Sequence, residues 1–449
     1  MQTGRLKAAA FLLSLGCAPA WSANILSIYQ DALAKDAELA ASKARLESQR
    51  ETQEQAFSGL LPQVSLNASY TDTSSETDLI DNNDSEVGEW NVTGRQVLFD
   101  GNTWNTWEAS KQALVAAEYT YNSDIQDLTL RASTAYIELL RAHENLTLRI
   151  AEEKAVGRQL EQTKQHFEVG LIPITDVHEA QASFDDTRVN RIVAQNDLNI
   201  AFEELTKLTG QAYANIDGLS KDFPITMPVP EGSQSWVDKA IANNPSLAAS
   251  NAAVLAAQEE LDSSKSGHYP TIDLTATYQD QSVDADDPML DGSDPENTII
   301  ALNFTLPLYA GGGVSASVRQ ATSDLEESRQ DLIFANRTIT QQTRTLYSLV
   351  TTNVLRIDAR KQAVVSSTSA LEATELGYEV GTRNIVDVLI AQSNLYESQR
   401  NLANARYDYI LNLFQLKLVA GELAQADIED LNQWLTGAQI TTVEVTKNL

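Results

Sequence analysis

Three short patterns in this 449-residue chain contain residue types that perform chemistry in other proteins. His178-Glu179 begins like a zinc-binding helix, but position 182 is an alanine where a second histidine is needed. Gly311-Gly312-Gly313 lacks the following Lys-Ser/Thr pair of a phosphate loop, so a hinge explains it better. The acidic run from Asp284 to Gly292 lacks the ligand spacing of a calcium loop. We therefore expect no catalytic residue, no metal site and no cofactor.

Two charged residues, Asp176 and Arg383, stand at breaks between long helical patterns. An aspartate at a helix start is ordinarily an N-cap, and an arginine at a turn is ordinarily solvated. Taken alone, they make only a weak case for a functional pair. The helices that position them are more informative.

The two breaks are copies of each other, at 168–177 and 379–388. Each lies between two helical stretches, so each is expected to be the tip of a helical hairpin, over 168–175 and 379–385. An offset of 211 residues superimposes identical residues in and beyond the tips, which indicates a duplicated chain. The matched pairs include Gly170 with Gly381, Ile174 with Ile385, Asp176 with Asp387, and Gln181 with Gln392.

The first repeat, 23–210, is expected to begin with one helix over 24–60 and a β-hairpin over 62–99. Within the hairpin, Val64, Leu66, Ala68 and Tyr70 alternate with polar residues, and an acidic loop over 71–89 separates the strands. A helix over 103–167 follows, roughly 95–100 Å long. After the tip, a return helix ends at Gly210.

The second repeat, 235–420, has the same order. We expect a helix over 235–266, a β-hairpin over 270–309 with an acidic loop at 280–297, a helix over 314–378, the tip, and a return helix over 386–420. The segment 211–234 is a linker or a short α/β patch at the middle of the rods. The segment 421–449 is a second such segment with one short helix and a tail.

Composition points to export. Residues 1–22 have the charged start, apolar core and small-x-small site of a signal peptide. The single cysteine, Cys17, lies inside this segment, and the leucine before it is one place too close for a lipoprotein site. Without the segment the charge is 30 − 62 = −32, because Arg5 and Lys7 account for two of the 32 basic residues. Such a balance disfavours nucleic acid; it either biases a lumen toward cations or serves solubility.

The strand and helix lengths demand assembly. No later segment has the apolar length of a spanning helix, whereas four strands of about ten residues match transmembrane β-strands. Strand edges cannot face lipid, and the smallest closed barrels have about eight strands, so copies of the chain must close the barrel together. Rods about 100 Å long with narrow apolar stripes also need partners. Two, three or four copies would satisfy both demands.

The tips and strand blocks resemble those of the TolC outer-membrane channel family. The resemblance implies a membrane α+β fold, in which a homotrimer forms a 12-stranded transmembrane β-barrel continued by a periplasmic α-helical coiled-coil barrel. It implies efflux or type I secretion with a periplasmic adaptor protein and an inner-membrane RND or ABC transporter. The residues that resemble the family most are Val169-Gly170-Leu171, Ile174-Thr175-Asp176-Val177, Val380-Gly381-Thr382-Arg383 and Ile385-Val386-Asp387-Val388-Leu389.

The resemblance also implies roles at the tips. Thr175, Asp176, Tyr378 and Arg383 match a gate network that closes the tunnel, and Asp387 matches an acidic ring at its entrance. Ile390 stands where the family has a second acidic ring, which leaves a more apolar entrance. Residues that match adaptor-docking notches are Val169, Gly170, Leu171, Val380, Gly381 and Thr382.

Two alternatives remain open from the residues. A structural or adhesive coiled-coil stalk, anchored by a small barrel, would use the same rods and strands but would extend outside the cell. Separately, Tyr70, Trp90, Tyr278 and Tyr309 near strand ends are expected either to form membrane-interface belts or to pack between strands.

Overall fold

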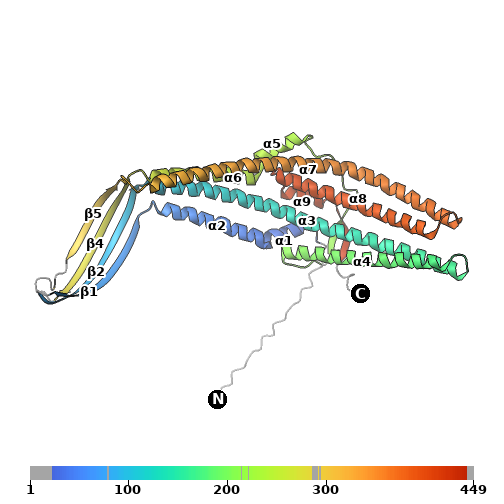
Figure 1. Cartoon of the computed structure of the whole chain (residues 1–449), viewed down its shortest axis with the longest axis horizontal. Coiled ribbons are helices and arrows are strands. Elements are labelled where there is room, and N and C mark those ends of the chain that lie inside the picture. Colours follow the sequence, from blue (N-terminus) through green and yellow to red (C-terminus); the bar gives the residue numbers. More distant parts are fainter. Residues whose placement is uncertain are drawn as a thin grey trace, which may run out of the picture.

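The computed structural model describes residues 23–77, 80–213, 215–220, 222–285, 292 and 295–441. The expected signal peptide, with Cys17, lies outside these residues. The described chain is long and narrow (Figure 1), with a β-sheet at one end and two helical hairpin tips at the other. Helices run the whole distance between them, so the chain has the proportions of a wall segment rather than of a globule.

The sheet is antiparallel and its strands follow the order β1-β2-β4-β5. The expected acidic loops were wrong in extent. Residues 71–77 and 80–89 continue β1 and β2 in a ladder with one register shift, between Ser75 and Thr77, and 280–285 continue β4. Acidic side chains are compatible with these strands because Asp72, Glu86 and Asp284 are exposed. The strand bounds are β1 (Gln63–Thr77), β2 (Ile80–Phe99), β4 (Thr271–Ala285) and β5 (Glu296–Thr305).

The first repeat has four helices where three were expected, because the chain breaks at Asp36. The extended backbone of Asp36 ends the first helix, and its side chain accepts a hydrogen bond from the Leu39 N–H to start the second. Because Asp36 is the only residue between these two helices, the helical pattern of apolar residues continues across it and gives no sign of the break. The bounds are α1 (Ile25–Lys35), α2 (Ala37–Ser58), α3 (Gly101–Glu168) and α4 (Ile174–Thr209).

The second repeat breaks at the equivalent place. Asn244 caps the following helix by accepting from the Leu247 N–H at 3.0 Å, and Pro245 occupies the first helical position. The expected single helix over 235–266 is therefore two. The bounds are α5 (Ser233–Asn243), α6 (Pro245–Ser266), α7 (Gly313–Glu379) and α8 (Ile385–Val419).

The two irregular segments join at the middle of the rods. Strand β3 (Asn215–Leu219), from the linker, pairs antiparallel with β6 (Leu435–Thr441), from the C-terminal segment. Helix α9 (Gln425–Asn432) lies beside α1. The Tyr136 hydroxyl of α3 donates to the Asp217 carbonyl at 2.6 Å, which fixes this patch to the rods.

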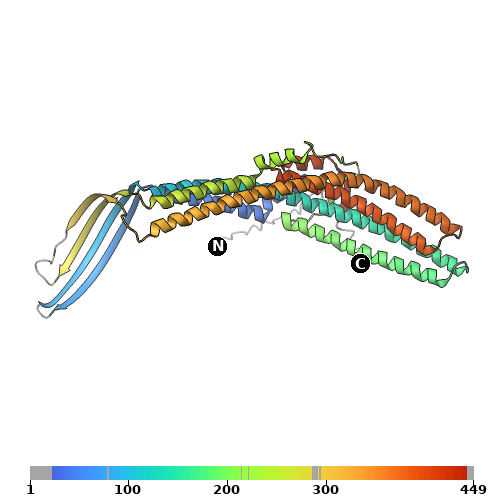
Figure 2. The same ribbon diagram turned by 45° about the horizontal axis from the view of Figure 1, so that its top comes forward.

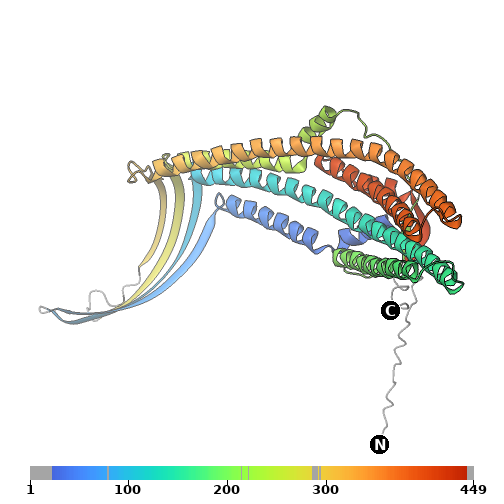
Figure 3. The same ribbon diagram turned by 45° about the vertical axis from the view of Figure 1, so that its right-hand side comes forward.

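The helices form one curved layer (Figures 2 and 3). On the strand side of the middle, α3 packs between α2 and α6, and α6 packs on α7. On the tip side, α3 packs between α4 and α8, and α8 packs on α7. Only α3 and α7 run through both halves. The layer thus has two free edges, formed by α2 and α4 on one side and by α7 on the other.

The apolar face of α7 is buried where this helix packs on α5 and α6. Leu325 and Ala321 pack with Leu261 of α6, and Ile339 packs with Ala240 and Leu247. The main core lies further along, where α1, α3, α4, α7, α8, α9 and the small sheet meet. Among the described helices, none has a stretch both long enough and apolar enough to cross a membrane.

Candidate functional site

Each hairpin tip turns at a glycine with positive φ. Gly170 has φ 78° and Gly381 has φ 76°, a region that side-chain-bearing residues rarely adopt. At both glycines the turn is closed by backbone hydrogen bonds back to the end of the long helix, from Leu171 N to His166 O at 2.9 Å and from Thr382 N to Gly377 O at 2.8 Å. Both repeats therefore have a glycine at this position because the turn requires a positive φ.

The tips expose apolar side chains to solvent. Val169, Leu171 and Val380 are each 70–75% exposed. A single exposed apolar residue needs no explanation, but a matched group at the end of a rod indicates a contact surface. The six residues expected to form docking notches, Val169, Gly170, Leu171, Val380, Gly381 and Thr382, all lie on these two turns.

Tyr378 connects the two hairpins. It comes from the last turns of α7, its ring stacks on His166 of α3 at 6.5 Å between centroids, and its hydroxyl is buried beside Thr163. Burial, and then the negative charge of Asp176 on α4, raise the pKa of Tyr378. Thr175 donates to Asp176 at 3.3 Å. Three of the four expected gate residues thus lie together.

Arg383 lies apart from that group within one protomer. Its guanidinium is 3.9 Å from the Asp387 carboxylate, one turn along the start of α8, and its side chain crosses closely over Gly377. Asp387 also takes part in a capping box with Asn384, whose side chain accepts from the Asp387 N–H at 2.8 Å. The expected ring residue and the expected gate arginine therefore form one pair, while Asp176 lies near Tyr378 without a hydrogen bond to it.

A small apolar cluster holds the two tips to each other. Val156 and Leu160 of α3 and Ala180 of α4 contact Ile385 and Leu389 of α8, with Tyr378 at the edge. This cluster is separate from the main core. The tips are therefore held by few apolar contacts, which makes their separation less costly than separation at the middle of the rods.

Ile390 lies one turn beyond Asp387 and is 55% exposed. Arg383, Asp387 and Ile390 line a cleft of about 490 Å³ between α7 and α8, with Asn394 further along. Because position 390 is apolar, Asp387 is the carboxylate that lines this cleft in each protomer, and the guanidinium of Arg383 lies beside it.

A polar layer that the sequence did not reveal separates the two cores. Glu152 of α3 is 3% exposed and accepts from Arg149 at 2.9 Å and from Arg400 of α8 at 2.8 Å. Burial lowers the pKa of Arg400, while the carboxylate of Glu152 opposes that change. The next residue, Glu153, pairs with Arg191 of α4 at 2.6 Å. Adjacent glutamates in a charged helix are common, so only the packing shows that this pair ties α3 to both return helices.

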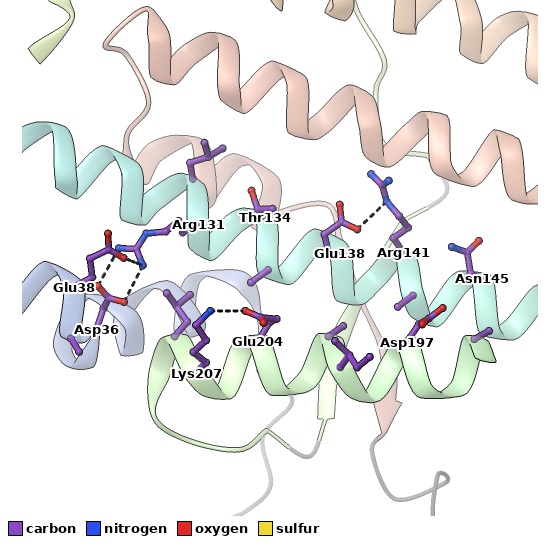
Figure 4. Close-up of a pocket in the computed structure, with 18 residues that line it drawn as sticks. Asp36, Glu38, Arg131, Thr134, Glu138, Arg141, Asn145, Asp197, Glu204 and Lys207 are labelled. Carbon is purple, nitrogen blue, oxygen red and sulfur yellow. Dashed lines mark hydrogen bonds and ion pairs between the residues drawn. The ribbon is translucent and has the colours of Figure 1, made fainter. Parts of the chain in front are cut away.

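A groove of about 810 Å³ opens along the free α2 and α4 edge (Figure 4). Its floor is apolar, with Leu130 and Ile200 among the lining residues. Asp36 and Glu38 pair with Arg131 at one end, each at 3.2 Å. Asp197 also lines the groove. Within the described part of the chain, no group of three or more His, Cys, Asp or Glu residues could hold a metal ion.

A sheet with two edge strands, continued by a curved helical layer with two free edges, defines a protomer of an oligomeric tube. The model of the family described as outer membrane efflux protein matches residues 28–211 and 236–422. The chain belongs to this outer membrane efflux protein family.

Individual relatives agree with this membership. Outer membrane protein TolC of Vibrio cholerae is 36% identical over 93% of this chain and 95% of that protein. The alkaline protease secretion protein AprF of Pseudomonas aeruginosa is 27% identical over 94% of this chain and 89% of that protein. The crystal structure of VceC from Vibrio cholerae, 21% identical, has the same fold, with a TM-score of 0.76 over 89% of this chain and 97% of that one.

Membership settles the class of protein. The chain is an outer-membrane export channel that works as a homotrimer with a periplasmic adaptor and an inner-membrane pump. Its four strands supply one third of the 12-stranded barrel, and its helices supply one third of the periplasmic tunnel. An adhesive stalk outside the cell is not compatible with this placement.

Proposed function

We propose that the two hairpin tips of this chain form the gate of the export channel and receive the adaptor that opens it. The activity is transport rather than catalysis. The observation that carries the proposal is the separation of the tips from the main core, with charged groups and exposed apolar residues concentrated on the tips. Such a region can move without disturbing the rest of the wall.

The protomer edges fit each other by internal symmetry. Within one chain, α3 of the first repeat packs against α6 and α8 of the second. By the duplication, α7 of one protomer occupies the same position against α2 and α4 of the next. The groove of Figure 4 lies on that α2 and α4 edge. In the second repeat, Asp408 of α8 is the equivalent of Asp197, and it forms ion pairs with Arg141 of α3 and Arg356 of α7.

The gate is completed between neighbouring protomers. Within one protomer Arg383 faces Asp387, and Asp176 with Thr175 faces Tyr378. A network that includes all four must therefore join the α8 start of one chain to the α4 start of another. Each exposed ion pair contributes about 0–1 kcal/mol, so a threefold set holds the gate closed and still yields to a partner.

The entrance has one acidic residue for each protomer. Three copies of Asp387 form the acidic ring, and Ile390 makes the next level apolar. Because Arg383 lies beside Asp387, the field at this ring is weaker than that of three free carboxylates. The entrance is therefore expected to retain cations weakly.

The docking surface consists of the two tip turns. Val169-Gly170-Leu171 and Val380-Gly381-Thr382 present matched exposed side chains, two sets for each protomer and six for the trimer. An adaptor with complementary apolar hairpins would dock on these sets and draw the α7 and α8 hairpin outward. The apolar cluster around Leu160 and Ile385 is the contact that this motion would loosen.

The cargo is small molecules, proteins or both. Relatives in this family include TolC and a protein named for alkaline protease secretion, which supports both uses. Deleting the gene and measuring drug sensitivity together with the set of secreted proteins will separate them. If the deletion changes neither drug sensitivity nor the set of secreted proteins, a role in export is contradicted.

The gate itself is tested in planar bilayers with purified trimer. We expect a small closed conductance that rises when the tips are loosened by substitution. A wild-type trimer that already conducts at the maximum level would contradict a closed gate. If the tip variants and the wild type have the same conductance, the gate does not lie at the tips.

A further inference from the structure

The two faces of the four-stranded sheet differ along the half nearest the helices. On one face the paired positions are apolar: Val64 lies opposite Gly94, which in turn lies opposite Ala276, and Ala276 lies opposite Ile300. The neighbouring rows are mainly apolar and pair Leu66 with Val92 and Tyr278, Leu274 with Leu302, and Ile272 with Phe304. Val92 and Ile272 are half-buried and the other five are exposed in the protomer. The polar members of these rows are Gln96, opposite Leu274, and Thr298, opposite Tyr278.

The opposite face of the same half is polar and internally bonded. Thr93 and Thr277 are 3.1 Å apart, and Asn67 donates to Asn91 at 3.1 Å. Arg95 lies 3.5 Å from Asp273. In a barrel of this kind the apolar face meets lipid and the polar face lines the lumen.

This polarity changes abruptly beyond Tyr278. In the next row along the lipid-side face, Asp280 lies directly opposite Glu296 and Trp90. Beyond that, three carboxylates stand in one row across three strands, because Asp72 pairs with Glu86 and Glu86 pairs with Asp284. Charged carboxylates in this arrangement cannot remain in hydrocarbon, because burying each one there costs several kcal/mol unless it becomes protonated and neutral.

The lumen-side face does not change in the same way. At the level of the carboxylate row, Val87 lies opposite Val283, and both are half-buried, while the adjacent rows pair Ser69 with Glu89 and Gln281, and Thr73 with Ser85. The change from apolar to acidic is thus confined to the lipid-side face. It occurs within a continuous ladder, so it reflects a change of solvent around the sheet and not a change of fold.

Aromatic side chains mark the boundary. The Trp90 ring packs on Tyr278 at 5.4 Å between centroids, and its Nε1 donates to Asp280 at 3.2 Å. The Tyr70 hydroxyl donates to Glu86 at 2.6 Å. The Trp90 ring thus packs toward the apolar row of Tyr278 while its Nε1 bonds to an acidic side chain of its own row, the arrangement of an aromatic residue at a membrane interface. Tyr70 stands one row further out.

The lengths agree with this boundary. From Thr271, where β4 begins, to Tyr278 the strand covers about 23 Å, or about 18 Å across a membrane at a tilt near 40°. The exposed Tyr269, just before the strand, extends this apolar stretch toward the band of about 25 Å that an outer-membrane barrel presents. Strand β2 is 20 residues long, about twice what the crossing needs.

We propose that the outer hydrocarbon boundary lies at the successive rows of Tyr278 and Trp90, and that the sheet beyond them, from the row of Tyr70 and Ser282 onward, stands outside the bilayer as an acidic collar. The partner of the lower half is lipid hydrocarbon. The partner of the collar is water and the polar layer of the outer leaflet. The channel therefore opens well above the membrane surface, and its outer rim repels anions.

Cysteine labelling on intact cells tests the proposal. Cys17 is the only cysteine, so a Cys17→Ser background has none. We expect a membrane-impermeant maleimide to label Asp72→Cys and Asp284→Cys at least tenfold faster than Val64→Cys and Ile300→Cys. Equal rates for the two sets, whether fast or slow, would overturn the boundary.

A charge substitution gives an independent measurement if a cysteine variant fails to assemble. Ile300→Asp places a carboxylate in the proposed lipid band, and Ser282→Asp places one in the proposed collar. We expect the amount of assembled trimer in the outer membrane to fall at least tenfold for Ile300→Asp and to stay at the wild-type level for Ser282→Asp. An equal fall for both, or for neither, would overturn the proposal.

Discussion

Arg400 of α8 donates to the buried carboxylate of Glu152 of α3 at 2.8 Å, in a layer that lies between the main core and the apolar cluster at the tips. The pair joins helices from the two repeats. Because Glu152 is almost completely buried, its charge is stabilised only by Arg400 and Arg149.

Replacing Glu152 by alanine is expected to destabilise the protomer strongly. The change leaves the buried guanidinium of Arg400 without its carboxylate, which costs about 3–5 kcal/mol. The measurement is the thermal midpoint of the trimer in detergent. Asp262→Asn, which breaks an exposed pair with Lys265 on α6, is the matched control and should change the midpoint little.

A double variant distinguishes charge burial from packing. Replacing Glu152 and Arg400 together by leucine removes both charges and is expected to recover most of the lost stability. If the double variant is as unstable as Glu152→Ala, the ion pair is not the reason for the loss.

Opening of the gate is predicted for substitutions on both sides of the proposed protomer contact. Arg383→Ser and Asp176→Ala should each raise the single-channel conductance several-fold, and Tyr378→Phe, which removes only a hydroxyl, should raise it less. Asp186→Asn, on the exposed surface of α4, is the control and should leave the conductance unchanged. Unchanged conductance in both Arg383→Ser and Asp176→Ala would refute the assigned network.

Loss of adaptor docking is predicted for polar substitutions at the tips. Leu171→Ser combined with Val380→Ser should reduce export in cells at least tenfold while the conductance of the purified channel stays at the wild-type level. Val229→Ser removes a similarly exposed side chain in the middle segment and should not affect export. If export is normal in the tip variant, docking occurs elsewhere.

Acid sensitivity is predicted at the joint between α1 and α2. Burial alone would raise the pKa of the Asp36 carboxyl, but hydrogen bonds from Arg131 and the Leu39 N–H, with the positive charge of Arg131, hold it below its usual value. Because the folded-state pKa is lowered, this stabilisation is complete above the ordinary carboxyl pKa, near 4, and is lost as the pH falls through the folded-state value.

Asp36→Asn isolates the charge, because asparagine is an equally good helix cap. We expect the variant to be about 1–3 kcal/mol less stable than the wild type between pH 6 and 8, and this difference to shrink below about pH 4. Thermal midpoints across that range measure it. Glu38→Gln, at a mostly exposed carboxylate, is the control. A difference independent of pH would contradict the ionic explanation.

Local features of this protein could be predicted from the residues alone. The long helices, the tip turns and the duplication depend on periodicity and on glycines such as Gly170 and Gly381, whose positive φ is set by the turn itself. The alternation at Val64, Leu66 and Ala68 was sufficient to indicate a two-faced strand.

Features that depend on distant partners could not be predicted. The acidic segments after Tyr70 and before Trp90 are strands because each pairs with the other across the ladder, although their composition is typical of loops. Tertiary packing alone selected Glu152, among many glutamates of the long helices, as a buried link to Arg400. It also separated Arg383 from Asp176 within one protomer, because the two tips are held side by side by apolar contacts rather than by their charges. Periodicity and turn chemistry act over a few residues, whereas burial and charge pairing depend on which helices meet.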